Sequence, residues 1–212
     1  MASAGATLGL PSTALVGRTM PKKAFYEHLE VSAAVKDEFV HSIERIELVA
    51  VLKESSIHVP AGETVAEVDV LGIHLKDDAA ASVPLAAIDL IARSIPNKLL
   101  FACFSEGKCK LVVRRGKLYK TEWVPQDKVR LQLQGSTLDE LWDSLGAQAV
   151  FGDADPSDFA GRLQRKGELE SLREQLKKLQ KKRQAERQIA RRNALWDQIK
   201  SVENRIAELE AR

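Results

Sequence analysis

The sequence predicts an α+β protein in which a mixed, mostly antiparallel sheet with packed helices is followed by a long C-terminal coiled-coil helix. Helical and strand-like apolar patterns come in blocks over residues 1–152, which favours an antiparallel sheet over a doubly wound nucleotide-binding fold. From residue 168 onward Gly and Pro are absent and Ala, Leu, Glu, Lys, Gln and Arg dominate, as in a long helix. We therefore expect a globular body at 1–152, an acidic linker with a short helix at 153–167, and the long helix at 168–212.

Two helices and two strands are expected in the first half of the body. Pro21 takes a preferred first helical position, and Ser32 is suited to cap the next helix, whose apolar residues recur every four positions. Two apolar, β-rich runs come next, separated by a Pro-Ala-Gly turn. The predicted elements are helices over 21–29 and 33–42 and strands over 46–52 and 64–75.

The second half of the body starts with an amphipathic helix that Pro96 ends. The run after it contains Glu106-Gly107 as a turn signal, and Ser136 opens a capping-box-like start to the last helix of the body. The predicted elements are a helix over 84–95, a hairpin over 99–113, strands over 117–124 and 129–133, and a helix from 136.

Two cysteines lie in the predicted hairpin. With the turn at its centre, Phe104 faces Cys109 and Cys103 faces Lys110. Side chains alternate along a strand, so the two sulfur atoms lie on opposite faces of the sheet and no disulfide is expected. We expect a reduced, cytoplasmic protein, because the N-terminal segment lacks the pattern of a secretory signal and no window is apolar enough to span a membrane.

Charge is distributed unevenly along the chain. There are 32 Lys+Arg and 30 Asp+Glu, which gives a formal net charge of +2. Residues 1–160 hold 17 basic and 22 acidic residues, a net of −5, whereas residues 161–212 hold 15 basic and 8 acidic residues, a net of +7. The small total argues against nucleic-acid binding through bulk charge, but it conceals an acidic body and a basic tail.

Two heptad seams run along the tail, and a tryptophan stands one residue off the second seam. The seams are out of phase, because 16 residues separate the last leucine of the first from the first leucine of the second. One interpretation is a single helix with a local unwinding, and the other is a helical hairpin that turns near 181–187. Segment 181–192 contains no turn-forming residue, so we expect one continuous helix. The expected coiled-coil interface consists of Leu169, Leu172, Leu176, Leu179, Leu195, Trp196, Ile199, Val202, Ile206 and Leu209.

A dense group of basic residues lies between the two seams, with Glu186 as the only acidic residue among them. On one helix these residues would spread over most of the circumference, which suits contact with phosphates or an acidic partner better than tight self-packing. The alternative is an ordinary solvated coiled-coil surface. The members are Lys177, Lys178, Lys181, Lys182, Arg183, Arg187, Arg191 and Arg192.

No constellation in the sequence indicates catalysis. Nucleophile-elbow, phosphate-loop and dinucleotide-binding glycine motifs are absent. The four histidines, His28, His41, His58 and His74, have no metal-ligand spacing. We therefore expect a protein that is not an enzyme and that holds neither a metal nor a cofactor.

A metal-dependent nuclease is the alternative function. Glu67, Asp69 and Lys108 superficially match the carboxylates and the Glu-x-Lys piece of restriction-type nucleases. Those enzymes place the lysine on a strand that directs it to a metal-bound water. Lys108 instead follows the predicted turn at Glu106-Gly107, which argues against this alternative.

Several short motifs occur in an order that is similar to a known family. They are Leu10-Pro-Ser-Thr13, Pro21-Lys-Lys-Ala-Phe-Tyr26, Ala61-Gly-Glu-Thr-Val-Ala-Glu67, Ile95-Pro96 and Thr121-Glu-Trp123, followed by a helix with Glu186-Arg-Gln188. Together they make nearly the whole chain resemble the prokaryotic family catalogued as domain of unknown function 4391. The resemblance supplies no catalytic residues. It implies a setting beside helicases and DNA methyltransferases, in islands that look like restriction or anti-phage systems.

These observations lead to one expected function. We expect a non-catalytic accessory or scaffold subunit of such a DNA-processing complex, which docks a helicase or DNA methyltransferase, or contacts DNA, through its C-terminal helix. A homodimeric coiled-coil scaffold is a further alternative, with the seam residues as its interface.

Overall fold

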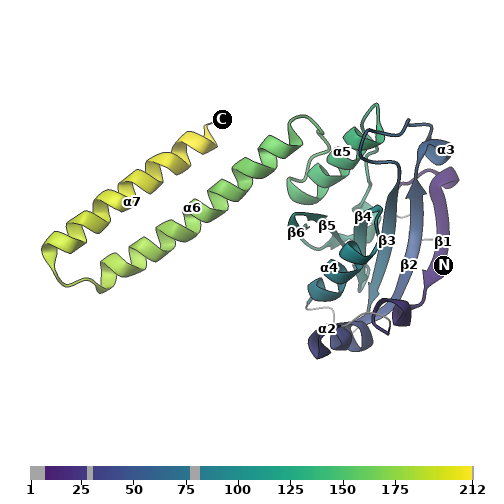
Figure 1. Ribbon diagram of the computed structural model, residues 1–212, viewed down its shortest axis with the longest axis horizontal. Helices are drawn as coiled ribbons and strands as arrows, with labels where there is room; N and C mark the ends of the chain where they lie inside the picture. Colours follow the sequence, from purple (N-terminus) through teal and green to yellow (C-terminus); the bar gives the residue numbers. More distant parts are fainter. Residues whose placement is uncertain (1–7, 28–30, 77–81, 212) are drawn as a thin grey trace. The chain divides into compact units, whose positions relative to one another are not determined.

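A mixed sheet of seven strands organises the N-terminal part of the chain (Figure 1). The structure is a computed structural model that describes residues 8–27, 31–76 and 82–211. Six strands lie side by side in chain order, and β7 pairs with β5. All neighbouring strands are antiparallel except β3 and β4, which are parallel and are joined through α4. The strands are β1 Leu15–Met20, β2 Ile43–Leu52, β3 Val68–Leu75, β4 Lys98–Ser105, β5 Lys108–Arg115, β6 Lys117–Lys120 and β7 Val124–Pro125.

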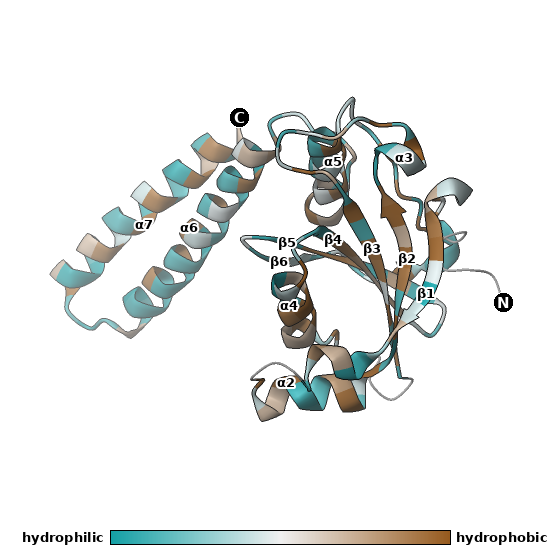
Figure 2. Ribbon diagram, turned by 45° about the vertical axis from the view of Figure 1, so that its right-hand side comes forward, coloured by the Kyte–Doolittle hydropathy of each residue, from teal (hydrophilic) through white to brown (hydrophobic). Residues whose placement is uncertain are grey.

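Helices cover both faces of this sheet, so its central strands are apolar on both sides. On one face α5 (Leu138–Val150) packs Leu141 and Leu145 against a cluster that includes Val70 of β3. On the other face α4 (Leu85–Ser94) buries Ile88 in a cluster that includes Phe101 of β4. In Figure 2 β2 and β3 are largely hydrophobic, whereas the C-terminal helices are mostly hydrophilic. The expected α+β class is confirmed.

The N-terminal elements differ from the predicted ones in detail. β1 was not predicted, because it is an edge strand whose four central residues are exposed and which therefore carries no apolar alternation. The helix expected over 21–29 is only the short 3-10 helix η2, Lys22–Phe25, and residues 28–30 lie outside the described part. The helix expected over 33–42 is α2, Ala33–Asp37, which is capped by Ser32 and continues as the π-helical turn η3, Glu38–Ser42.

Two further segments were predicted differently from what is observed. The strand expected over 129–133 is not formed: Val129 and Leu131 are buried in the α5 core, and the Leu131 N–H donates a single bond to the Leu8 carbonyl, 2.8 Å. The last helix of the body, expected from 136, is α5, which begins at Leu138 with Thr137 rather than Ser136 as its N-cap. The short elements η1 Ser12–Ala14, α3 Glu54–Ile57 and η5 Gln126–Lys128 complete this part.

The two cysteines lie as the predicted hairpin requires. Phe104 pairs with Cys109 and Cys103 pairs with Lys110, and the turn uses positive φ angles at Glu106 and Gly107, 47° and 73°. Cys103 belongs to the α4 core and Cys109 to the α5 core, and both are free thiols. The predicted placement on opposite faces is confirmed.

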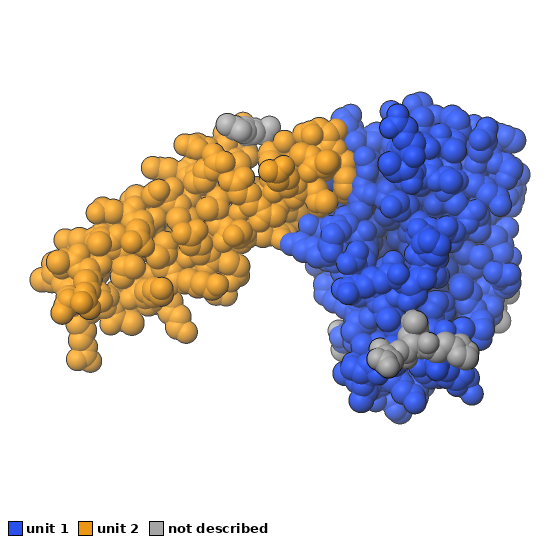
Figure 3. All heavy atoms as spheres, in the orientation of Figure 1, with its two compact units in different colours: residues 1–157 blue, residues 158–212 orange. Residues whose placement is uncertain are grey.

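The chain divides into two compact units, Met1–Ser157 and Asp158–Arg212, which Figure 3 colours separately. The second unit is a hairpin of two antiparallel helices, α6 Phe159–Ala185 and α7 Ile189–Glu210. The prediction of one continuous helix is therefore wrong, and α6 begins at Phe159 rather than at residue 168. Inter-helix ion pairs Arg173–Glu210 and Arg205–Glu168, at 2.7 and 2.8 Å, join the two helices at the end away from the turn.

The hairpin forms because folding back brings the two out-of-phase seams face to face. Leu179, Ile199 and Val202 are buried in one cluster, with Leu172, Leu176, Leu195 and Ile206 packed around them. The turn needs no glycine, since Glu186 and Gln188 adopt ordinary extended angles with φ of −77° and −79°. The Gln188 N–H also donates to the Glu186 carboxylate, 2.8 Å. Among the described residues no helix is both long and apolar enough to cross a membrane.

Candidate anion-binding surface and a polar cluster at the sheet edge

The predicted basic residues gather at the turn end of the hairpin. They occupy the last turns of α6, the connection and the first turn of α7. All are exposed except Arg183, which is partly buried. We call this set the basic tip; its members are Lys177, Lys178, Lys181, Lys182, Arg183, Arg187, Arg191 and Arg192.

None of the basic-tip residues forms an ion pair with another described residue. The rest of the hairpin is different, because Arg173, Arg205 and Lys200 are paired with Glu210, Glu168 and Glu203. The hairpin therefore neutralises its charges at one end and leaves them uncompensated at the other.

This arrangement costs stability in two ways. Lys177 and Lys181, like Lys178 and Lys182, are like charges four residues apart on a helix, an arrangement that costs about 0.2–0.5 kcal/mol per pair. Arg191 lies in the first turn of α7, where the helix dipole disfavours a cation. A bound anion would remove both costs, so the basic tip is suited to an anionic partner.

Trp196 is held by cations of its own hairpin rather than by the apolar seam. The Arg183 guanidinium carbon lies 4.5 Å and the Lys200 Nζ 4.7 Å from the ring centroid. The ring remains 41% exposed. Of the other predicted seam residues, Leu209 is buried and Leu169 partly buried, and neither belongs to the central cluster of the hairpin.

Sequence reasoning missed one apolar residue of the tip. Ile189 is the first residue of α7 and is 68% exposed. A groove of about 480 Å³ is lined by residues of both helices, among them Lys182 of α6 and Arg191, Ala194 and Leu195 of α7. The sequence signal that could have revealed Ile189 is that it is an aliphatic residue outside both heptad seams.

The nuclease alternative required Glu67, Asp69 and Lys108 to lie together, and the structure does not bring them together. Val68 of β3 pairs with Lys98 of β4, whereas Lys108 pairs with Ser105 at the far end of β4. Seven residues of strand correspond to about 23 Å. The site that this alternative requires, with Lys108 beside Glu67 and Asp69, is therefore not formed.

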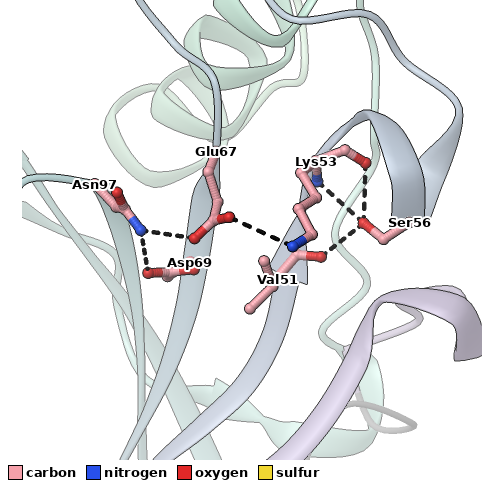
Figure 4. A network of polar contacts seen from close by, with 6 residues as sticks. All are labelled: Val51, Lys53, Ser56, Glu67, Asp69 and Asn97. Carbon is pink, nitrogen blue, oxygen red and sulfur yellow. Dashed lines mark hydrogen bonds and ion pairs between the residues drawn. The ribbon is translucent and has the colours of Figure 1, made fainter.

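Two other residues surround Glu67 and Asp69 (Figure 4). The Asn97 side-chain N–H group donates to Glu67 Oε1 at 2.7 Å and to Asp69 Oδ2 at 3.0 Å. Lys53 Nζ lies 3.8 Å from Glu67 Oε2, and the Ser56 hydroxyl accepts the Lys53 backbone N–H at 3.0 Å. We call Lys53, Glu67, Asp69 and Asn97 the Asp69 cluster.

Asp69 is the most unusual carboxyl group among the described residues of the sheet. It is 8% exposed, and its Oδ1 has no hydrogen-bond partner in the described structure. Burial raises the pKa of Asp69 above its ordinary value, the nearby Glu67 charge adds to the rise, and the hydrogen bond from Asn97 opposes it.

Histidine and cysteine contribute no metal site in the described part of the chain. There, no group of three or more His, Cys, Asp or Glu side chains is arranged to hold a metal ion. His41 lies in η3, His58 follows α3 and His74 lies in β3, and His28 lies outside the described residues. Burial raises the pKa of both thiols, that of Cys109 to about 12, so neither is poised as a nucleophile.

The fold and the surface together define an α+β protein that carries a basic helical hairpin. The chain belongs to the family described as a domain of unknown function, DUF4391, which matches residues 8–206. The match therefore includes most of the hairpin as well as the sheet. No curated protein and no solved structure is significantly similar to the chain.

Proposed function

We propose that this chain is a non-catalytic accessory subunit of a prokaryotic DNA-processing complex of the restriction or anti-phage type, and that the basic tip is its docking surface. The observation that carries the proposal is the concentration of exposed, unpaired cations at one end of the hairpin. A helicase or DNA methyltransferase would be its protein partner, and the DNA of that complex would lie against the tip.

The density of charge supports contact with a phosphate backbone. Residues 177–185 cover only about 13 Å of helix, and the first turn of α7 adds its arginines beside them. Duplex DNA presents a negative charge every ~1.7 Å of its axis, so several phosphates fit within that length. Arginine and lysine contacts of this kind position a protein on DNA without reading its sequence.

The hairpin also weakens the alternative of a homodimeric scaffold. Leu179, Ile199 and Val202 are buried between α6 and α7 of the same chain. The apolar seam that a second chain would need is therefore already occupied within one chain. Trp196 and Ile189 are what the hairpin leaves exposed for a protein partner.

The setting of the family supports the same proposal. The resemblance to the family implies helicases and DNA methyltransferases as neighbours, and an accessory subunit that contacts DNA fits such a setting. In this proposal the sheet forms the core of the protein, and the hairpin provides the surface that contacts the partner.

The test measures binding of a duplex DNA by fluorescence anisotropy over a series of salt concentrations. One variant changes Lys178, Lys181 and Arg191 of the basic tip to Gln. The matched control changes three exposed body lysines, Lys108, Lys120 and Lys128, to Gln and has the same change in net charge.

Wild type and control should bind with the same steep salt dependence. The tip variant should bind more weakly at every salt concentration, and its log–log salt slope should be shallower by about 2.7, at about 0.9 per lost phosphate contact. Equal binding by all three proteins would remove the basic tip as the DNA surface.

A further inference from the structure

The Asp69 cluster lies where three strands of the sheet end together (Figure 4). Lys53 follows β2, Glu67 precedes β3 and Asn97 precedes β4. Asp69 pairs with Val51 on one side and with Leu99 on the other, so the four side chains meet at one level of the sheet. This cluster belongs to the N-terminal unit and is independent of the proposed function of the hairpin.

The contacts within the cluster leave the carboxylates incompletely satisfied. One neutral donor group, on Asn97, bridges Glu67 and Asp69 at 2.7 and 3.0 Å. The only described ion pair in the cluster is Lys53–Glu67; Asp69 has no cation within ion-pair distance, although the charge of Lys53 also acts on it. Buried polar atoms in proteins nearly always have partners, so the unpartnered Oδ1 of Asp69, a residue that is only 8% exposed, requires an explanation.

A divalent cation would supply what is missing. It would neutralise two carboxylates that now face each other across a single amide, and it would give the unpartnered oxygen a ligand bond. Mg²⁺ and Mn²⁺ are commonly held by one or two carboxylates with water completing the shell. Asn97 can turn its amide to present the oxygen instead of the nitrogen, because both lie on the same group.

The chemistry of the side chains selects the class of cation. The cluster offers carboxylate and amide oxygens, and it contains no thiolate or imidazole. Oxygen donors suit Mg²⁺, Mn²⁺ and Ca²⁺ rather than Zn²⁺ or Cu²⁺.

We infer that Glu67 and Asp69 bind a divalent, oxygen-preferring cation such as Mg²⁺ or Mn²⁺, with Asn97 as the third protein ligand. Lys53 stands beside the cation as a neighbour of Glu67 and not as a ligand. Its side chain is 47% exposed, so it can move away when the cation takes over the charge of Glu67.

The experiment titrates MnCl₂ into the full chain by calorimetry and records thermal unfolding at each concentration. Asp69→Asn and Glu67→Gln remove one ligand charge each. Glu54→Gln is the matched control, because Glu54 is exposed, lies next to Lys53 in the chain and is outside the cluster. Lys53→Gln distinguishes a metal site from a structural ion pair.

Wild type and Glu54→Gln should bind one Mn²⁺ and should unfold at higher temperature as MnCl₂ increases. Asp69→Asn and Glu67→Gln should bind Mn²⁺ at least tenfold more weakly. Lys53→Gln should bind Mn²⁺ at least as tightly as wild type, because the substitution removes a positive charge from beside the cation.

Two results would overturn the inference. The first is no saturable binding to wild type up to about 10 mM MnCl₂, above the weakest class of protein sites for divalent cations. The second is wild-type affinity in a folded Asp69→Asn variant. Folding of this variant is checked without metal, where it should be at least as stable as wild type, because a buried charge has been removed. DNA binding by the basic tip is measured separately and does not depend on either result.

Discussion

Truncation of Ile199 tests whether the hairpin is held together within one chain. Ile199 is 1% exposed and packs with Leu179 and Val202 between α6 and α7. Ile199→Ala removes three carbon atoms, each worth about 0.8 kcal/mol of burial, and leaves part of a cavity. We expect a loss of about 3 kcal/mol from the local stability of the hairpin.

Hydrogen exchange followed by mass spectrometry measures this loss in the full chain. About 3 kcal/mol corresponds to roughly a hundredfold faster exchange of the protected amides, in peptides of both α6 and α7. The matched control is Ile189→Ala, since Ile189 is 68% exposed and its truncation should change stability by less than about 0.5 kcal/mol. Exchange should not depend on protein concentration, because the contacts are intramolecular.

Two results would refute the reasoning. If Ile199→Ala left exchange in α6 unchanged, the seam of α7 would not pack on α6. If protection rose with protein concentration, the seam would be shared between chains, as the homodimeric alternative requires.

Three further predictions follow from individual groups. The pKa of Asp69 is raised in the folded state, so the native protein keeps the proton on the Asp69 carboxyl group to higher pH than the unfolded chain does. The stability of the wild type should therefore fall as pH rises above the ordinary carboxyl pKa of about 4. Asp69→Asn should remove that fall in urea unfolding measured from pH 3 to 7. The Thr64 hydroxyl, 2.7 Å from Asp139, holds the pKa of Asp139 below its ordinary value, so this contribution is present at neutral pH and is lost as pH falls through the folded pKa; Asp139→Ala should lower the melting temperature at pH 7 and have less effect near pH 3. Burial raises the pKa of Cys103 and Cys109, so neither should react with a disulfide reagent at pH 7 until denaturant is added. Rapid reaction of the native protein would show that the β4–β5 strand pair opens.

Local patterns predicted much of the body. Pro96 and the apolar spacing before it indicated α4, and the Glu106-Gly107 turn signal led to the correct pairing of Cys103 with Lys110. Each of these predictions depends on residues within about ten positions of one another. β1 was not predicted because its central residues face solvent. The strand expected over 129–133 is not formed, because burial of apolar residues alone does not make a strand.

Of the two candidate sites, one could be predicted from the sequence and the other could not. The basic tip is contiguous in sequence, so its composition was visible from the start. The partners of Glu67 were not, because Lys53 and Asn97 reach it only through the antiparallel pairing of β2 with β3 and the parallel pairing of β3 with β4. Lys108, the lysine that the nuclease motif indicated, begins β5 and pairs with Ser105, at the end of β4 far from Glu67.

The sequence by itself determined that the body is α+β, that the tail is helical and that the positive charge belongs to the tail. It also contained both apolar seams and the slip in phase between them. Only the tertiary structure decided that the tail turns back at 186–188. The hairpin forms because packing the two apolar seams against each other stabilises the tail more than continuing it as one helix would. That choice changed an extended run of basic residues into a compact tip, and strand pairing likewise gathered the Asp69 cluster from three separate parts of the chain.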